Sequence, residues 1–202
     1  MPRVLTQTDV ADFRERLCDA ATRLFDARGR EGFTMRELAS ELGVSAMTPY
    51  RYFKDKDDIL AAVRARAFNR FADALEKAFH DATGAANKSA AVFQAYVAFA
   101  FGEPAAYRLM FDLSQPDESA FPELMDANTR ARATMTDYVR ALVRDGILEG
   151  DADLIGHVFW ASLHGAVVLK LAGKLGAAYD FDRISGESFR VLFEGYLPRK
   201  RA

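Results

Sequence analysis

The chain has 202 residues, of which 50% are hydrophobic and 28% are charged, and its formal net charge is −2. A near-neutral chain is not expected to bind nucleic acid through general attraction to phosphate, although a local basic patch can still recognise one sequence. One cysteine excludes an internal disulfide framework, and the absence of a signal-peptide core or a long uncharged apolar run predicts a cytoplasmic protein without a membrane span.

The first part of the chain predicts a series of helices joined by short turns. Apolar residues at spacings of three and four predict a helix over residues 10–27. Thr34 is a suitable N-cap for a second helix, and Gly43 is a suitable end for it. Ser45 can cap a third, short helix over residues 46–53.

The rest of the chain has no alternating pattern typical of strands. Asp55 is a good N-cap for a long helix over residues 55–82. Residues 84–88 are predicted to form a loop, and further helices are expected over residues 89–101, 105–113, 122–145, 152–173 and 183–197. The sequence therefore predicts an all-α protein.

Residues 34–56 predict a helix–turn–helix. The second half of this segment, T-P-Y-R-Y-F-K, is rich in polar, aromatic and cationic side chains that a core does not need. A helix–turn–helix presents its second helix to the major groove of DNA. Residues 1–60 contain 10 Lys and Arg against 11 Asp and Glu, so any DNA binding would depend on a local patch, which Arg36, Arg51, Lys54 and Lys56 could form.

Four sequence stretches in this region match a known pattern in order and spacing. They are R-L-C-D-A-A-T-R-L-F-D-A-R-G at residues 16–29, G-F-T-M-R-E-L-A at 32–39, G-V-S at 43–45 and T-P-Y-R-Y-F-K-D-K at 48–56. Residues 13–63 thereby resemble the N-terminal domain of the TetR family of transcriptional regulators. Pro49 stands where the family usually has leucine, and we expect a slightly altered helix start with the site retained.

The resemblance implies two domains. Residues 1–54 would form a three-helix DNA-binding domain, and residues 55–202 would form a helical domain that binds an effector and dimerises, with residues 55–82 as the connecting helix. A shorter resemblance, at residues 107–111 and in W-A-S-L-H-G at 160–165, points to the ligand-binding domain of one TetR subgroup. In the family the last two helices, here residues 152–173 and 183–197, usually pair with those of a second copy.

The family motif implies which residues contact DNA. Candidates for phosphate contact are Thr34, Tyr52, Lys54 and Lys56; candidates nearer the base edges are Arg36, Ala46, Met47, Thr48 and Tyr50; Ser45 and Arg51 complete the set. The alternatives are that Met47 belongs to the core, that Tyr52 packs on the first helix, and that Arg51 pairs with an acid. A dimer should recognise a palindrome with half-sites about 34–36 Å apart.

The effector site is harder to predict, because aromatic residues in a helical domain are more often core than pocket wall. The candidate ligand contacts are Phe68, Tyr96, Phe99, Tyr107, Phe111, Trp160 and His164. His157, Trp160 and His164 share a helix face, but a histidine satisfied by one structural hydrogen bond is the alternative for each. No third ligand lies at a suitable spacing, so no metal is expected.

The predicted function is a sequence-specific transcriptional regulator, a repressor released from a palindromic operator by a small-molecule effector. Metalloprotease, nucleophile-elbow, P-loop and dinucleotide-binding motifs are absent from the sequence, so no enzyme activity and no cofactor are expected. The alternative is a helical adaptor that binds other proteins.

Overall fold

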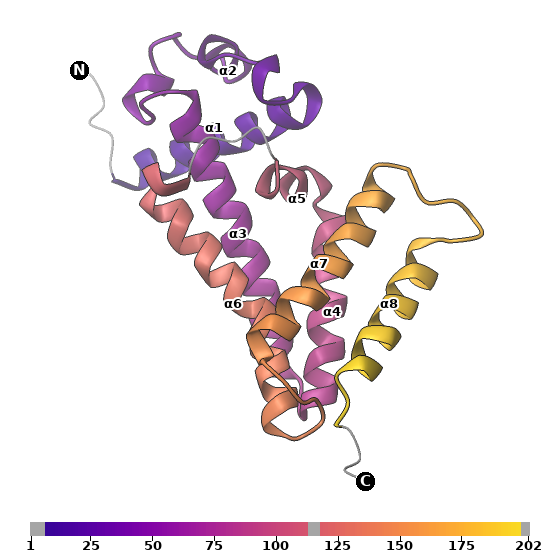
Figure 1. Ribbon diagram of the computed structural model, residues 1–202. Coiled ribbons are helices and arrows are strands. Elements are labelled where there is room, and N and C mark those ends of the chain that lie inside the picture. The colour runs from indigo at the N-terminus through magenta and orange to yellow at the C-terminus, as the bar shows by residue number, and fades with distance from the viewer. Residues whose placement is uncertain (1–6, 113–117, 199–202) are drawn as a thin grey trace. The chain divides into compact units, whose positions relative to one another are not determined.

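The computed structural model describes residues 7–112 and 118–198, and these are helices joined by turns, with no strand among them (Figure 1). This confirms the all-α prediction. The chain divides into two compact units, Met1–Asn69 with Ala105–Asn128 and Arg70–Pro104 with Thr129–Ala202. The predicted domain boundary after residue 54 stays a prediction.

The first unit contains the helix–turn–helix region. Its elements are α1 (Gln7–Arg28), the 3-10 helix η1 (Arg30–Gly32), α2 (Met35–Glu41), the 3-10 helix η2 (Pro49–Arg51), the first part of α3 (Lys56–Asp81), α5 (Pro104–Met110), η3 (Glu118–Ala120) and the start of α6 (Pro122–Arg144). Apolar side chains from α1, α2, α3 and α5 share one core, which includes Leu17, Leu38, Phe53, Ile59 and Leu109.

Among the described residues of the first unit, one charged side chain is buried. Arg64 of α3 is 4% exposed, donates from Nη2 to the carbonyl of Met110 at 3.4 Å, and forms an ion pair with Glu118. Asn128 donates to the same carboxylate at 2.6 Å. Burial lowers the pKa of Arg64, and the Glu118 carboxylate opposes that change. This network connects α3, α5 and the start of α6.

The second unit contains the rest of α3 and α6 together with α4 (Ala85–Gly102), α7 (Ala152–Leu171) and α8 (Phe181–Gly195). α7 packs against α8 and α4 (Figure 1). The predicted cap of α7 is confirmed, because the Asp151 carboxylate accepts from the backbone N–H groups of Asp153 and Leu154 at 2.9 and 3.2 Å. Asp180 caps α8 in the same way.

The loop predicted over residues 84–88 is wrong, because α4 begins at Ala85. Gly84 has a φ of 83°, which lets the chain enter the helix immediately after it. Ala85 is buried in the core of the second unit, and the Asn87 side chain donates to the carbonyl of Thr83 at 2.9 Å. These contacts hold a first helical turn whose sequence has no strong N-cap.

The apolar character of α7 also differs from the expectation. We expected no segment that could span a membrane, yet α7 is long and apolar enough by length and composition, with a mean hydropathy of 1.4. One such helix is weak evidence for a membrane, because core helices of soluble proteins pass the same test. Only 28% of the most apolar 18-residue window of α7 is buried, and Leu154, Ala161 and Val168 are exposed at spacings of seven, which places them on one face.

Gly156 tests the close packing of α7 on α6. A Cβ at this position would lie 2.8 Å from the carbonyl oxygen of Met135 and 3.1 Å from Cα of Thr136. Gly156→Ala should therefore lower the free energy of unfolding by about 1–3 kcal/mol through overpacking, an effect larger than the ~0.5–1 kcal/mol that alanine adds to helix stability. Urea denaturation measures the change.

The matched control is Gly186→Ala in α8, where a Cβ meets no atom within 4 Å. This variant should be as stable as the wild type or slightly more stable. Equal stability of the two alanine variants would contradict the close approach of α6 and α7.

Candidate functional site

Local interactions position α2 as predicted. The Thr34 hydroxyl accepts from the Glu37 backbone N–H at 3.2 Å while the Glu37 carboxylate accepts from the Thr34 N–H at 2.9 Å, which is a capping box. At the other end Gly43 has a φ of 66°, and the Val44 N–H donates to the Ala39 carbonyl at 3.0 Å. Residues of the motif therefore provide hydrogen-bond partners for backbone groups at both ends of α2.

The second helix of the motif differs from the prediction. Residues 46–53 were expected to form an α-helix, but the structure has turns followed by η2 (Pro49–Arg51). Pro49 has no N–H to donate to the Ser45 carbonyl, which instead accepts from the Thr48 N–H at 2.8 Å. The expectation of only a slightly altered helix start was therefore wrong.

Two buried side chains still hold this segment against the core. Pro49 is buried, and Phe53 is 2% exposed. Arg14 of α1 donates to the Tyr52 carbonyl at 2.7 Å, and its guanidinium lies 4.3 Å from the centre of the Phe53 ring. Arg14 was not among the predicted site residues, because its partners are 38 or more positions away in the sequence and no local pattern connects them.

Most of the predicted DNA-contact residues are exposed. Met47 is 67% exposed and Tyr50 is 48% exposed, so the alternative of a core Met47 is wrong. The other exposed candidates are Thr34, Arg36, Ser45, Ala46, Arg51 and Lys54, and Thr48 is half-buried. They lie on α2, on the turn after it and around η2.

Cations on this surface fall into two groups. Arg36, Arg51 and Lys54 have no ion-pair partner within residues 7–112 and 118–198, so the alternative of a paired Arg51 is not observed there. Arg23 and Arg28, by contrast, pair with Glu41 and Glu37 at 2.8 and 3.0 Å. Arg36, Arg51 and Lys54 are therefore cations of the motif that remain available to a phosphate.

Two candidates have structural contacts that compete with DNA binding. Tyr52 is half-buried, and its ring centre lies 4.9 Å from that of Phe13, so the alternative of packing on α1 is observed. Lys56 donates from Nζ to the Arg30 carbonyl at 2.9 Å and lies 3.6 Å from the Glu31 carboxylate. Lys56 thus ties α3 to the turn before α2.

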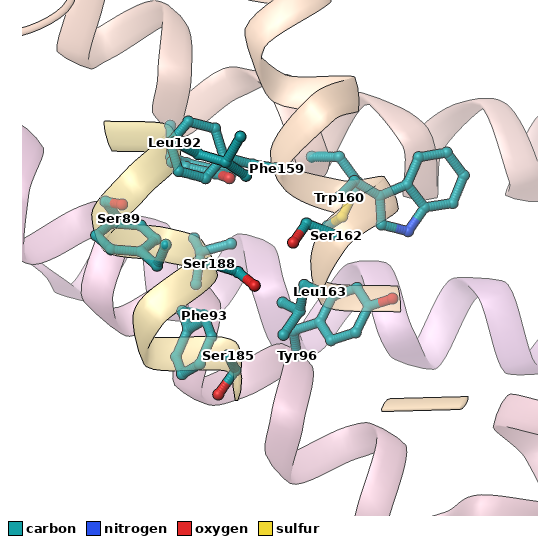
Figure 2. Close-up of a pocket in the computed structure, with 14 residues that line it drawn as sticks. Ser89, Phe93, Tyr96, Phe159, Trp160, Ser162, Leu163, Ser185, Ser188 and Leu192 are labelled. Carbon is teal, nitrogen blue, oxygen red and sulfur yellow. The ribbon is translucent and has the colours of Figure 1, made fainter. Parts of the chain in front are cut away.

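The second unit contains a small cavity between α4, α6, α7 and α8. It has a volume of about 40 Å³, and Figure 2 shows the hydroxyl groups of Ser162 and Ser188 pointing into the space between α7 and α8. Its lining consists of Ser89, Val92, Phe93, Tyr96, Met135, Tyr138, Phe159, Trp160, Ser162, Leu163, Ser185, Ser188, Phe189 and Leu192. A cavity of this size holds only a few water molecules.

An open groove between α4 and α8 adjoins the cavity. Its volume is about 350 Å³, and its lining consists of Ala86, Ser89, Ala90, Phe93, Gln94, Leu142, Ser185, Gly186, Phe189 and Phe193. Tyr138 borders the cavity only, and burial raises the pKa of its hydroxyl far above the ordinary value. Its phenol therefore stays protonated.

Of the predicted ligand contacts, the structure brings Tyr96 and Trp160 to the cavity. Phe68, Tyr107 and Phe111 pack together in the first unit, with ring centres 5.0–6.0 Å apart, and Phe99 packs on Phe71 at 5.3 Å in the second unit.

The histidines of α7 lie near Trp160 but outside both linings. The ring centre of His164 is 6.4 Å from that of Trp160, and burial lowers the pKa of His164. Nδ1 of His157 lies 2.7 Å from the Asp153 carbonyl oxygen. Among the residues that the structure describes, no group of three potential ligands could hold a metal ion.

Comparison with known families decides what kind of protein this is. Residues 17–63 match the family described as bacterial regulatory proteins, tetR family, and residues 89–194, just over half of the chain, match the tetracyclin repressor-like C-terminal domain. The chain belongs to the TetR family. Both parts of the resemblance seen in the sequence are thereby confirmed.

Individual relatives agree with this assignment. The HTH-type transcriptional regulator SAB2452 of Staphylococcus aureus is 41% identical over 63 residues, which are 31% of this chain and 34% of that protein. The chain thus matches about a third of the length of this curated relative.

Among solved structures, a protein of unknown function from Rhodococcus sp. RHA1 has a TM-score of 0.79 and 26% identity, covering 98% of this chain and 100% of that one. The regulator FadR from Bacillus subtilis, solved with stearoyl-CoA, has a TM-score of 0.74 and 18% identity, with 90% and 98% coverage. The second similarity establishes the fold alone.

The Pro49 effect can be tested in this TetR-family chain by Pro49→Leu. Leucine restores an N–H that can bond to the Ser45 carbonyl, so residues 46–52 should become an α-helical turn. Backbone chemical shifts measured by NMR should move toward helical values in this segment. The control is Ala90→Leu, which adds a leucine at an exposed position of α4 and should leave the shifts of residues 46–52 unchanged. Unchanged shifts at residues 46–52 would contradict the role assigned to Pro49.

Proposed function

We propose that this protein is a sequence-specific DNA-binding transcriptional regulator of the repressor type. The observation that carries the proposal is the exposed polar and cationic surface around η2, held in place by the buried Pro49 and Phe53. Such a surface suits a duplex groove, which offers hydrogen-bonding edges inside a wall of phosphates. None of the reported similarities favours a protein-binding adaptor or an enzyme.

The exposed residues divide by chemistry into base readers and phosphate binders. Arg36 can donate two hydrogen bonds to a guanine, and Ala46 and Met47 can contact thymine methyl groups. Tyr50 suits either a base edge or a phosphate. Lys54 can bind phosphate and fix the register, whereas the contacts of Tyr52 and Lys56 assign those two side chains to positioning first.

We also propose that two copies form a dimer through α7 and α8. Exposed apolar residues on these helices are Leu154, Val168, Leu169 and Val191, each between 42% and 59% exposed. Exposed apolar residues on two helices that pack together are a common sign of a protein interface. A two-fold dimer presents two reading surfaces, so the operator is proposed to be a palindrome.

The cavity and groove of the second unit are proposed to bind a small-molecule effector in the cytoplasm. An effector releases DNA only if it binds one arrangement of the protein better than another, and typical couplings are about 1–3 kcal/mol. α3 and α6 each contribute residues to both units, so they are the proposed route of coupling. FadR of Bacillus subtilis was solved with stearoyl-CoA, which supports a small-molecule site in this fold.

Arg36 tests the reading surface. Arg36→Ala should weaken binding to a duplex enriched by the wild-type protein by about 5- to 150-fold, because one bidentate base contact contributes about 1–3 kcal/mol. Fluorescence anisotropy at about 150 mM salt limits the contribution of non-specific attraction. The matched control is Arg144→Ala, an exposed arginine near the end of α6. Equal losses in both variants would contradict a specific role for Arg36.

Val168 tests the dimer. Val168→Glu places a charge on the exposed stripe of α7 and should convert the dimer to monomer in sedimentation velocity experiments, because an unpaired charge is costly in an apolar interface. Met125→Glu is the control, because Met125 is 45% exposed but lies on α6 in the first unit. A Val168→Glu protein that still sediments as a dimer would exclude this stripe.

A further inference from the structure

The small cavity and the larger groove of the second unit share part of their walls. Ser89, Phe93, Ser185 and Phe189 line both hollows. The cavity of about 40 Å³ is too small for an effector, whereas the groove of about 350 Å³ has the size of a ligand site. A ligand would therefore enter at the groove, and turning the Phe93 or Phe189 ring would extend its site toward Trp160.

One hydroxyl group at this shared wall lacks a hydrogen bond. Ser89 is 4% exposed, and its Oγ has no hydrogen-bond partner. Buried hydroxyl groups are usually satisfied, and a helical serine commonly bonds back to a carbonyl of its own helix. Ser185, which faces the same two hollows and is 6% exposed, does so, since its hydroxyl donates to the Asp182 carbonyl at 3.4 Å.

The walls of both hollows carry no formal charge. Their polar groups are the hydroxyls of serine and tyrosine, the Gln94 amide and the Trp160 indole N–H, and the remaining side chains are apolar. A carboxylate or phosphate bound there would lose its hydration without gaining an opposite charge. A neutral molecule with an apolar body loses little and gains apolar contact.

We propose that the α4/α8 groove binds an uncharged ligand whose apolar body lies along Phe93, Phe189 and Phe193 and whose hydroxyl or carbonyl oxygen accepts a hydrogen bond from Ser89 Oγ. This proposal specifies the ligand class of the proposed effector site, and any effect of the ligand on DNA binding rests on that proposed function. Two properties of the wall set the ligand class: the unsatisfied hydroxyl of Ser89 and the absence of formal charge.

Decan-1-ol and decanoate are suitable probes, because they share a chain length and differ in charge. Trp160 is the only tryptophan of the chain and borders the cavity, so its fluorescence reports occupancy, and isothermal titration calorimetry gives an independent affinity. At about pH 8 decanoate is fully ionised. Decan-1-ol should bind the full-length wild-type protein at least about 10-fold more tightly than decanoate.

Two serine variants test the hydrogen bond. Ser89→Ala should weaken decan-1-ol binding by about 3- to 10-fold, the usual effect of one neutral hydrogen bond. Ser185→Ala removes the same group from the same walls, but its hydroxyl already has a partner, so binding should change less than about 2-fold. The unliganded Ser89→Ala protein should melt no lower than the wild type, which excludes misfolding as the cause.

Three results would overturn the proposal: no decan-1-ol binding by either method, decanoate binding as tightly as decan-1-ol, or equal effects of the two serine variants. A different result would contradict the effector role alone. Ser89-dependent binding of decan-1-ol with unchanged DNA affinity would support the ligand site and contradict its regulatory use.

Discussion

The surface proposed to read DNA depends on the burial of Pro49 and Phe53. These two side chains lie four positions apart and are both enclosed, so they hold one side of the segment against the core. Arg14 supports the arrangement from α1 by binding the Tyr52 carbonyl and covering the Phe53 ring. Met47, Tyr50 and Arg51 are exposed as a consequence of this anchoring, although their backbone is not an α-helix.

Apolar side chains of the second unit line internal hollows and also remain exposed on the outside of α7. The inner faces of α4, α7 and α8 enclose aromatic residues, a small cavity and part of a groove. α7 nevertheless leaves most of its residues unburied in a single chain, although it is the most apolar of the long helices. A dimer would cover such a face, and the nearby groove would then lie in a position to influence the pairing of the two copies.

Features set by nearby residues could be predicted from the sequence. Thr34, Gly43 and Asp151 act as expected, because a cap needs only a suitable side chain or a positive φ within a few positions. The Asp55 cap is also present, with its carboxylate accepting from the Asp58 N–H at 2.9 Å. Family resemblance then placed the whole motif in a known fold.

Features set by distant contacts could not be predicted. Tyr96 and Trp160 line the cavity while Tyr107 packs in the first unit, a distinction that depends on helix packing rather than on residue type. Pro49 altered the backbone more than its local chemistry suggested. A buried proline can be held in a tight turn by its packing, and a single sequence does not show that packing.

DNA reading by the η2 surface can be tested by selection from a random DNA pool with the purified protein at about 150 mM salt, where weak charge-driven binding is suppressed. A palindrome whose half-sites lie about 34–36 Å apart, one turn of the duplex, should be enriched. A folded, dimeric protein that enriches no sequence, both alone and with cell extract as a source of effector, would contradict the assignment of the η2 surface to DNA.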